Sequence, residues 1–184
     1  MGKYKVLTCR KPTKCEKCGR EIAKGEKYIR RTQRTNKRAR CNDCGAPRPS
    51  EMTGSETLSQ AYSIQENLEG YTDSETPLDI VGAIRDASNA VEELITEIDE
   101  KISNIEEYFP SGSPASERLQ EHRDGLEEWQ DELDEQLNEA ENLANILDEL
   151  YKENGDEADM DGEYGDKLVD LQQILSDLTG SLSI

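Results

Sequence analysis

The chain has 184 residues, of which only 33% are hydrophobic, with one Trp and one Phe, so a single large globular core is excluded. Its net charge of −19 divides unevenly: residues 1–50 hold 16 Lys and Arg against 4 Asp and Glu, a net of +12, whereas residues 51–184 hold 6 against 37, a net of −31. This asymmetry predicts two modules that have different partners.

The sequence predicts neither a membrane-spanning segment nor a signal peptide. No stretch approaches the roughly 18 apolar residues needed to cross a bilayer, and the first residues contain too short an apolar run for a signal peptide. We therefore expect no membrane partner and a cytoplasmic protein, or a virion-associated one if its source is viral. In a reducing compartment, paired cysteines favour metal binding over disulfides.

Two Cys-x-x-Cys-Gly motifs lie 22 residues apart in the basic module. Two thiolates separated by two residues can bind one ion from a tight turn, and the following glycine permits the positive φ angle that such a turn needs. Four thiolates complete a tetrahedral site, so we predict one structural Zn²⁺. A rubredoxin-like iron site and a redox or disulfide arrangement are the alternatives. The predicted metal ligands are Cys15, Cys18, Cys41 and Cys44.

The rest of the basic module is predicted to be β-rich. A short strand at 4–8 leads to Cys9, which we interpret as a small half-buried side chain rather than a fifth ligand. Residues 22–29 are typical of a turn entering a strand, and residues 30–40 are typical of a hairpin arm with its turn near 35–37.

This arm carries a cluster of cations beside one tyrosine. Such clusters attract phosphate backbones, and an aromatic ring can stack on a base. A solvated hairpin and a contact with the acidic module are the alternatives. The candidate nucleic-acid or polyanion ligands are Arg30, Arg31, Arg34, Lys37, Arg38, Arg40 and Tyr28.

The first cysteine motif continues into the pattern Cys-x-x-Cys-Gly-x-x-Ile-x-x-Gly-Glu-x-Tyr, which ends at Tyr28. This pattern resembles the opening of treble-clef fingers, including the PARP-type finger, and also zinc ribbons and small zinc-finger proteins of phages and other viruses. The resemblance covers residues 1–50 alone and implies a zinc-finger head. Pro47 and Pro49 disfavour a helix directly after Cys44, which favours the ribbon geometry.

The acidic module is predicted to be mainly helical. Residues 51–76 form a joint with one short helix from Ser55 to Glu69. Residues 77–155 form an antiparallel helical hairpin or coiled coil, because apolar residues recur at steps of three and four on both sides of a Pro/Gly/Ser break. An acidic loop and a third, shorter helix complete the chain over 156–184. The main predicted core positions are Ile80, Ile84, Val91, Leu94, Ile98, Ile102, Phe109, Leu126, Trp129, Leu133, Leu147, Tyr151, Leu168, Leu171, Leu175 and Leu178.

Together these features predict a non-enzymatic, zinc-stapled adaptor. Its basic head would bind nucleic acid or an assembly that carries nucleic acid, and its acidic tail would form a homo-oligomer or bind a helical partner. One alternative is a structural assembly protein, viral in origin, whose basic head docks on acidic tails. A rubredoxin-like electron carrier is the second alternative. No Ser-His-Asp set and no Gly-rich phosphate loop supports an enzyme.

Overall fold

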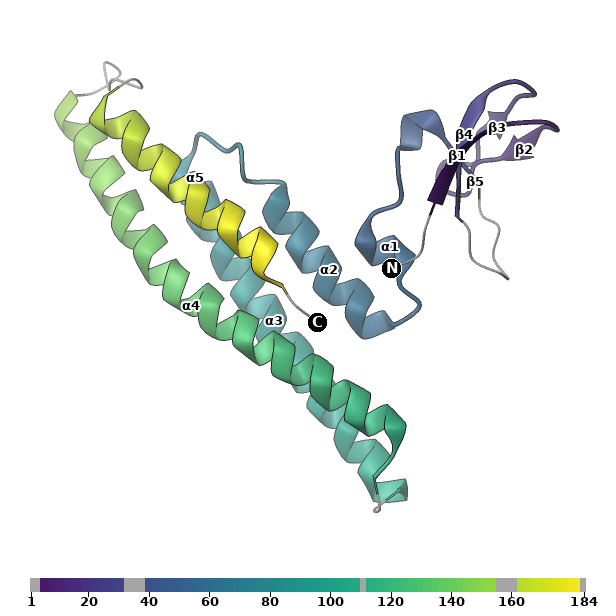
Figure 1. Cartoon of the computed structure of the whole chain (residues 1–184). Coiled ribbons are helices and arrows are strands. Elements are labelled where there is room, and N and C mark those ends of the chain that lie inside the picture. Colours follow the sequence, from purple (N-terminus) through teal and green to yellow (C-terminus); the bar gives the residue numbers. More distant parts are fainter. Residues whose placement is uncertain (1–3, 32–38, 110–111, 155–161, 183–184) are drawn as a thin grey trace. The chain divides into compact units, whose positions relative to one another are not determined.

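The computed structural model of the chain divides into two units, Met1–Ser59 and Gln60–Ile184. We call the first unit the head and the second the helical unit. As predicted, the chain is mainly helical and has a small antiparallel sheet near the cysteines (Figure 1). No helix in the described part of the chain is both long and apolar enough to cross a membrane. The described residues are 4–31, 39–109, 112–154 and 162–182.

The head contains two small antiparallel sheets. The first has three strands in the order β1 (Tyr4–Thr8), β4 (Lys27–Arg31) and β5 (Ala39–Cys41). The second pairs β2 (Thr13–Lys14) with β3 (Glu21–Ile22). The predicted strand at 4–8 is therefore present, and it forms the edge of the larger sheet.

The register of the larger sheet gives its two faces different roles. Tyr28 is paired with Leu7 on one side and with Cys41 on the other. Because side chains alternate along a strand, these residues share one face, and Ile29 and Arg40 point to the opposite face. Both Ile29 and Arg40 are buried there.

A 3-10 turn and a short helix follow the sheet. The turn, η1, spans Asn42–Cys44 and contains the end of the second cysteine motif. The helix α1 spans Pro49–Met52 and begins with its proline, a position where the missing N–H costs nothing. A side chain of Glu51 closes the first turn by accepting a hydrogen bond of 2.9 Å from the Arg48 N–H.

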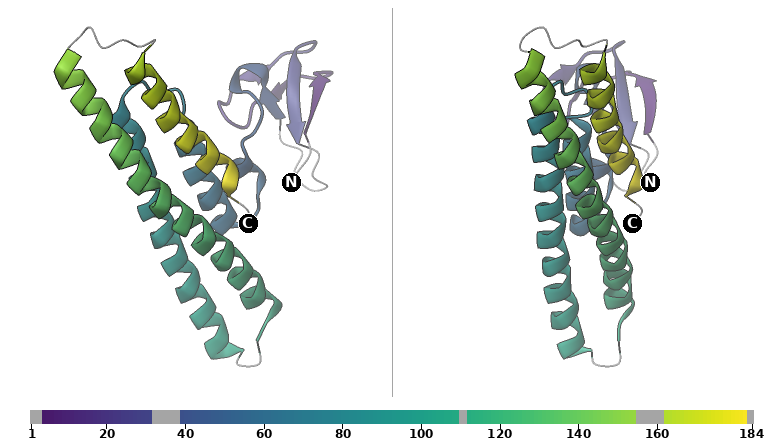
Figure 2. Two further views of the ribbon diagram at one scale, coloured as in Figure 1. Left: turned by 60° about the vertical axis from the view of Figure 1, so that its left-hand side comes forward. Right: turned by 90° about the vertical axis from the view of Figure 1, so that its left-hand side faces the viewer.

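The helical unit is built on two long helices. These are α3 (Pro77–Tyr108) and α4 (Pro114–Asn154), which lie side by side and run in opposite directions (Figures 1 and 2). Polar contacts fix their register: Arg85 Nη2 lies 2.6 Å from Glu141 Oε1, and Arg123 Nη1 lies 3.4 Å from Asp99 Oδ1. Between these pairs, the hydroxyl of Ser88 donates a hydrogen bond of 2.7 Å to Asp134.

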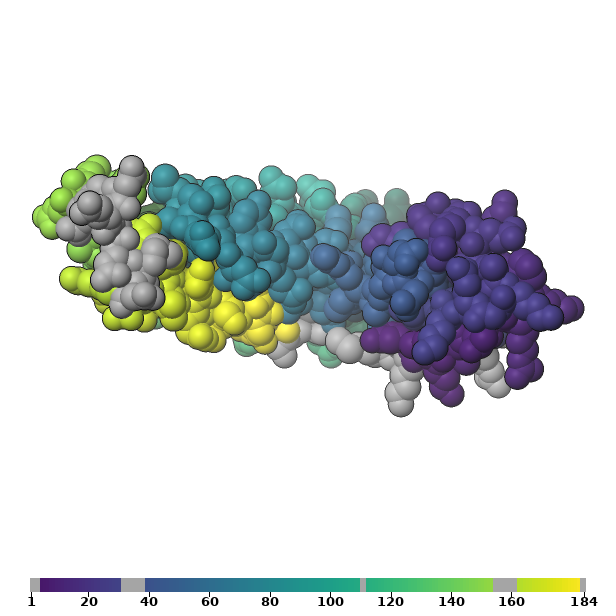
Figure 3. All heavy atoms as spheres, turned by 90° about the horizontal axis from the view of Figure 1, so that it is seen from above, coloured from purple at the N-terminus to yellow at the C-terminus, as the bar shows by residue number. Residues whose placement is uncertain are grey.

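Two shorter helices cover part of this pair. They are α2 (Glu56–Glu69), in which the boundary between the two units falls, and α5 (Glu163–Ser181). Figure 3 shows α2 and α5 side by side, and the amide of Gln65 donates a hydrogen bond to the Thr179 carbonyl oxygen. The four helices share one apolar core. Its largest fully buried side chains are Trp129, Leu68, Ile80, Ile84, Ile98, Leu126, Leu133, Leu147, Leu171, Leu175 and Leu178.

Two predicted core positions, Phe109 and Tyr151, lie outside this core. The side chain of Phe109 is 59% exposed, because α3 ends at Tyr108 and the backbone of Phe109 is no longer helical, with φ −130° and ψ 69°. Its side chain therefore leaves the apolar face on which Ile98 and Ile102 are buried. Tyr151, near the end of α4, is likewise 49% exposed.

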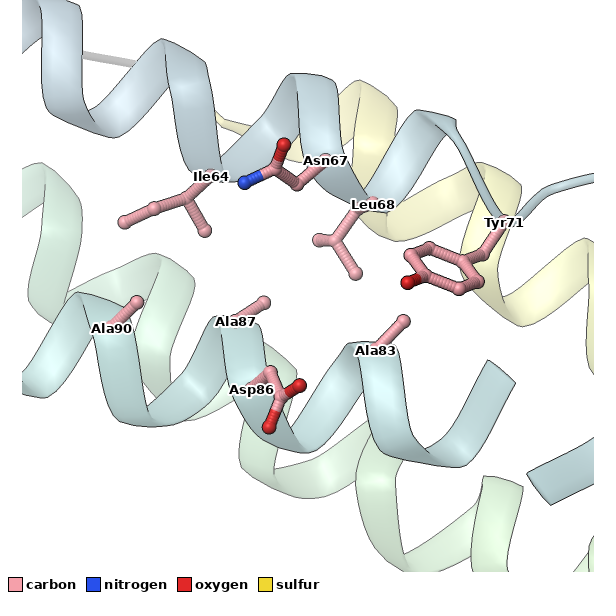
Figure 4. A pocket seen from close by; sticks show the side chains of 8 residues that line it. All are labelled: Ile64, Asn67, Leu68, Tyr71, Ala83, Asp86, Ala87 and Ala90. Carbon is pink, nitrogen blue, oxygen red and sulfur yellow. The ribbon is translucent and has the colours of Figure 1, made fainter. Parts of the chain in front are cut away.

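The contact between α2 and α3 leaves a cavity of about 230 Å³ (Figure 4). Alanines on α3 face larger side chains of α2 across this space. Leu68 still reaches the core and is fully buried. The lining includes Ala83, Ala87 and Ala90 on α3 and Ile64 and Leu68 on α2.

Candidate metal centre and basic surface of the head

Four cysteine sulfurs of the head converge on one point. The Sγ atoms of Cys15, Cys18, Cys41 and Cys44 all lie within 4.8 Å of one another. Cys15 Sγ is 3.8 Å from Cys44 Sγ, and Cys18 Sγ is 3.7 Å from Cys41 Sγ. A tetrahedron of sulfurs about 2.3 Å from a central ion has edges of about 3.8 Å, so the cluster can hold a metal ion. They are the four residues that the sequence predicts as metal ligands.

The first pair of cysteines lies in the turn that joins β2 to β3. The N–H of Cys15 donates a hydrogen bond of 2.8 Å to the Arg20 carbonyl oxygen, and the N–H of Gly19 donates one of 3.0 Å to the Cys15 carbonyl oxygen. Gly19 has φ 73°, in the left-handed region that side chains disfavour. The turn therefore needs the glycine that follows the Cys-x-x-Cys motif.

The second pair is presented differently. Cys41 is the last residue of β5, and Cys44 is the last residue of η1. Gly45 then has φ 68°, and its N–H donates a hydrogen bond of 3.1 Å to the Asn42 carbonyl oxygen. A hairpin turn and a single helical turn thus bring their sulfurs to the same point.

The surroundings of the sulfurs favour thiolates unequally. Burial raises the pKa of Cys15, but hydrogen bonds from the backbone of Cys18, Cys41 and Lys17 lower it to about 6. Hydrogen bonding with the Cys41 sulfur, and then with that of Cys18, raises the pKa of Cys44 to about 12. Four thiolates this close repel one another. The positive charge of a bound cation offsets this repulsion, so thiols that coordinate a metal ion are deprotonated.

Cys9 is not part of the cluster. Its side chain is only 3% exposed, and its Sγ–H donates a hydrogen bond of 2.9 Å to the Lys11 carbonyl oxygen. The backbone of Cys9 also exchanges hydrogen bonds of 2.8 Å with Gly25 and Glu26, which extends the pairing of β1 and β4. The sequence predicts a half-buried side chain at this position, and the structure buries it almost completely.

Arg40, predicted as a phosphate ligand, has two carboxylate partners within the head. Its side chain is 7% exposed, and its two Nη atoms donate hydrogen bonds of 2.8 and 2.7 Å to the two carboxylate oxygens of Glu51. Its Nε donates a further bond of 3.2 Å to Glu16. The guanidinium therefore joins α1 to both cysteine motifs, because Glu16 adjoins Cys15 and Arg40 adjoins Cys41.

The ion pair between Arg40 and Glu51 also changes the pKa of the Glu51 carboxyl. Hydrogen bonds from Arg40 lower the pKa of this carboxyl from 4.5 to about 2. Because folding lowers this pKa, the pair stabilises the head at pH values above 4.5, and that contribution is lost as the pH falls towards 2.

Replacing Arg40 with glutamine is therefore expected to lower the free energy of unfolding of the head by about 2 kcal/mol, because two partly buried carboxylates lose their shared cation. Denaturation of the metal-loaded protein, followed by the amide signals of the head, measures this change. Lys24→Gln is the matched control, since Lys24 is exposed and has no carboxylate within 4.0 Å in the described residues. Equal losses for the two variants would show that the Arg40 contacts contribute nothing.

The other predicted binding residues are distributed over β4 and the segment after it. Arg31 belongs to β4, and Tyr28 and Arg30 lie on the sheet face that carries Cys41. Arg34, Lys37 and Arg38 lie outside the described residues.

A groove beside Tyr28 and Arg30 has two further cations that the sequence did not single out. Arg10 and Lys11 follow Cys9 at the end of β1, and both side chains are exposed. Their only sequence signal is two adjacent cations outside the arginine-rich arm. Comparison with protein-family models, with curated proteins and with solved structures finds no match for this chain.

Proposed function

We propose that the four cysteines bind one structural Zn²⁺ and that the chain is a non-enzymatic adaptor. Its head binds nucleic acid, and its acidic helical unit contacts protein partners or further copies of itself. Four thiolates occupy every position of a tetrahedral zinc, so the ion holds the head together and offers no place to a substrate.

The apolar core of the head supports a stapling role for the metal. The buried cluster around the sulfurs consists of Cys9, Cys15, Cys41 and a single aliphatic side chain, Ile22. So small a cluster buries too little surface to offset the conformational entropy of folding. In domains of this kind, the free energy of metal binding supplies the free energy of folding.

Cations of the head that have no carboxylate partner support the proposed binding of nucleic acid. Four carboxylates of the head are already engaged with arginines: Glu16 and Glu51 contact Arg40, and Glu26 and Asp43 contact Arg20. In the described residues, a further set of cations has no carboxylate within 4.0 Å. This set is Lys5, Arg10, Lys11, Lys14, Lys24, Lys27 and Arg30. Zinc with four thiolates carries −2, so residues 1–50 keep a net charge of about +10.

The helical unit is proposed to act as an antiparallel coiled-coil hairpin with a third helix packed on it. The alternation of apolar residues and the polar contacts between α3 and α4 support this arrangement. Few cations are available to neutralise its acidic outer faces, and like charges in that density repel a nucleic acid. The two units would therefore serve different partners.

A binding measurement across a range of salt concentrations tests the proposal. The zinc-loaded full chain is titrated into labelled DNA and RNA oligonucleotides, and the logarithm of the association constant is plotted against that of the salt concentration. We expect a slope of about −0.7 for each phosphate neutralised on a single strand. Polyglutamate of matched charge is the control. Binding to polyglutamate but to no oligonucleotide at low salt would contradict the proposal and favour docking of the head on acidic proteins.

A further inference from the structure

We infer that the head holds a single nucleic-acid strand in a groove on one face of its larger sheet, where Tyr28 stacks on a base and Arg10, Lys11 and Arg30 contact phosphates. This inference rests on the proposed nucleic-acid binding and adds the site and the form of the ligand. The groove encloses about 760 Å³ beside β1, β4 and β5. That volume falls in the range of about 300–1,000 Å³ that is typical of sites for small organic groups.

The sheet register explains why a groove forms on this face. Tyr28 and Arg30 are two residues apart on β4 and so point the same way, and the residue paired with Arg30 on β5 is the small Ala39. On the opposite face, Ile29 and Arg40 are buried. The short side chain of Ala39 therefore leaves space on this face, and the ring of Tyr28 and the guanidinium of Arg30 border that space.

The metal centre holds the tyrosine in place. Tyr28 is half-buried and packs against the cluster that contains Cys15 and Cys41, and it also lines the groove. An aromatic ring fixed by its own packing loses little conformational entropy when a planar group stacks on it. The stapled core thus provides a rigid platform for a base, and stacking of this kind accepts any base.

The charges of the groove select a polyanion. Arg10, Lys11 and Arg30 contribute to the lining, and no carboxylate does. Within the described residues, none of these three side chains has an ion-pair partner within 4.0 Å. Three cations around one aromatic ring match a chain in which charged phosphates alternate with flat apolar bases.

A single strand fits this arrangement better than a duplex does. In a duplex the bases stack on one another, and their faces are not available to Tyr28. A duplex could contact the exposed cations only through its backbone, without using the ring. The inference therefore predicts that a single strand binds more tightly than a duplex of the same length.

Fluorescence anisotropy with the zinc-loaded full chain tests this. The probes are labelled oligothymidylate and oligouridylate of about 12 nucleotides, and the corresponding DNA duplex. We expect the double variant Arg10→Gln/Lys11→Gln to bind the single strands at least about tenfold more weakly, with a salt slope smaller by about 1.4, twice the value for one phosphate contact. Lys24→Gln/Lys27→Gln removes the same charge outside the groove and is expected to cost much less.

Two variants of the aromatic ring separate stacking from charge. Tyr28→Phe keeps the ring and is expected to keep the affinity, whereas Tyr28→Leu is expected to lose about fivefold or more without a change in the salt slope. Metal content and amide spectra verify that both variants retain the folded head. If the wild type binds single strands, but prefers the duplex or is weakened equally by the groove and control variants, the groove inference is overturned and the proposed function stands. If the wild type binds no oligonucleotide at low salt, both fail.

Discussion

Replacing Cys15 with serine is expected to unfold the head and to leave the helical unit folded. Structural zinc contributes about 10–16 kcal/mol in finger peptides, and loss of one thiolate removes much of that contribution. The small cluster around Ile22 cannot replace it. Amide NMR spectra should lose the dispersed signals of residues 4–31 and 39–52, while helical circular dichroism changes little, because α3, α4 and α5 belong to the other unit. Bound zinc should fall from one ion per chain to none.

Cys9→Ala is the matched control for this variant. It also removes a buried thiol from the apolar core of the head, but this thiol donates a hydrogen bond to the Lys11 carbonyl oxygen and lies outside the group of four sulfurs. Its expected cost is about 1 kcal/mol, the net worth of one hydrogen bond, with no change in metal content. A Cys15→Ser protein that retains one tightly bound ion and a dispersed head spectrum would refute the stapling role.

The four cysteines that can hold a metal ion could be predicted from the sequence because their spacing and turn chemistry are local. Two Cys-x-x-Cys-Gly motifs specify the ligand type, the spacing and the turn, and Gly19 and Gly45 have the positive φ that the motif requires. The first residues of the two long helices were predictable for the same reason. Pro77 and Pro114 each occupy the first position of a long helix, and the apolar alternation that follows them extends along one face of α3 and of α4.

The partners of the cations could not be predicted, because the sequence gives a charge but not what lies beside it. Arg40 has the same charge as Arg30, yet strand alternation turns it to the face where Glu16 and Glu51 lie. Arg10 and Lys11 lie outside the arginine-rich arm but border the groove that contains Arg30. Only the register of β1, β4 and β5 distinguishes a structural arginine from one that faces a groove.

The C-terminal end of α3 and its contact with α2 were also beyond the sequence pattern. Phe109 continues the apolar spacing of α3 but falls after its last residue, where the helical geometry no longer applies. Ala83 and Ala90 are not among the predicted core positions, yet they border the cavity between α2 and α3. The spacing of apolar residues in the sequence predicts which face of a helix is apolar. It does not predict how closely a neighbouring helix approaches that face.

Replacing Trp129 with alanine is expected to lower the free energy of unfolding of the helical unit by about 3–5 kcal/mol, the usual cost of removing a buried large aromatic side chain. Trp129 is 2% exposed in the shared core, and its Nε1–H donates a hydrogen bond of 3.2 Å to the Leu178 carbonyl oxygen. It therefore joins α4 to the last turns of α5. Urea denaturation followed by circular dichroism measures the loss, and hydrogen exchange should show α5 opening first.

Trp129→Phe separates the packing of the ring from its hydrogen bond. Phenylalanine retains much of the buried surface but cannot donate to Leu178, whose carbonyl oxygen still accepts a bond of 3.1 Å from the Ser181 hydroxyl. Because that acceptor stays satisfied, the loss should be far smaller than for alanine, about 1 kcal/mol plus the cost of the smaller ring. Two results would contradict this role of Trp129: a loss in the free energy of unfolding below about 1 kcal/mol for Trp129→Ala, or unchanged hydrogen exchange in α5. In either case, the apolar stripe of Leu171, Leu175 and Leu178 holds that helix by itself.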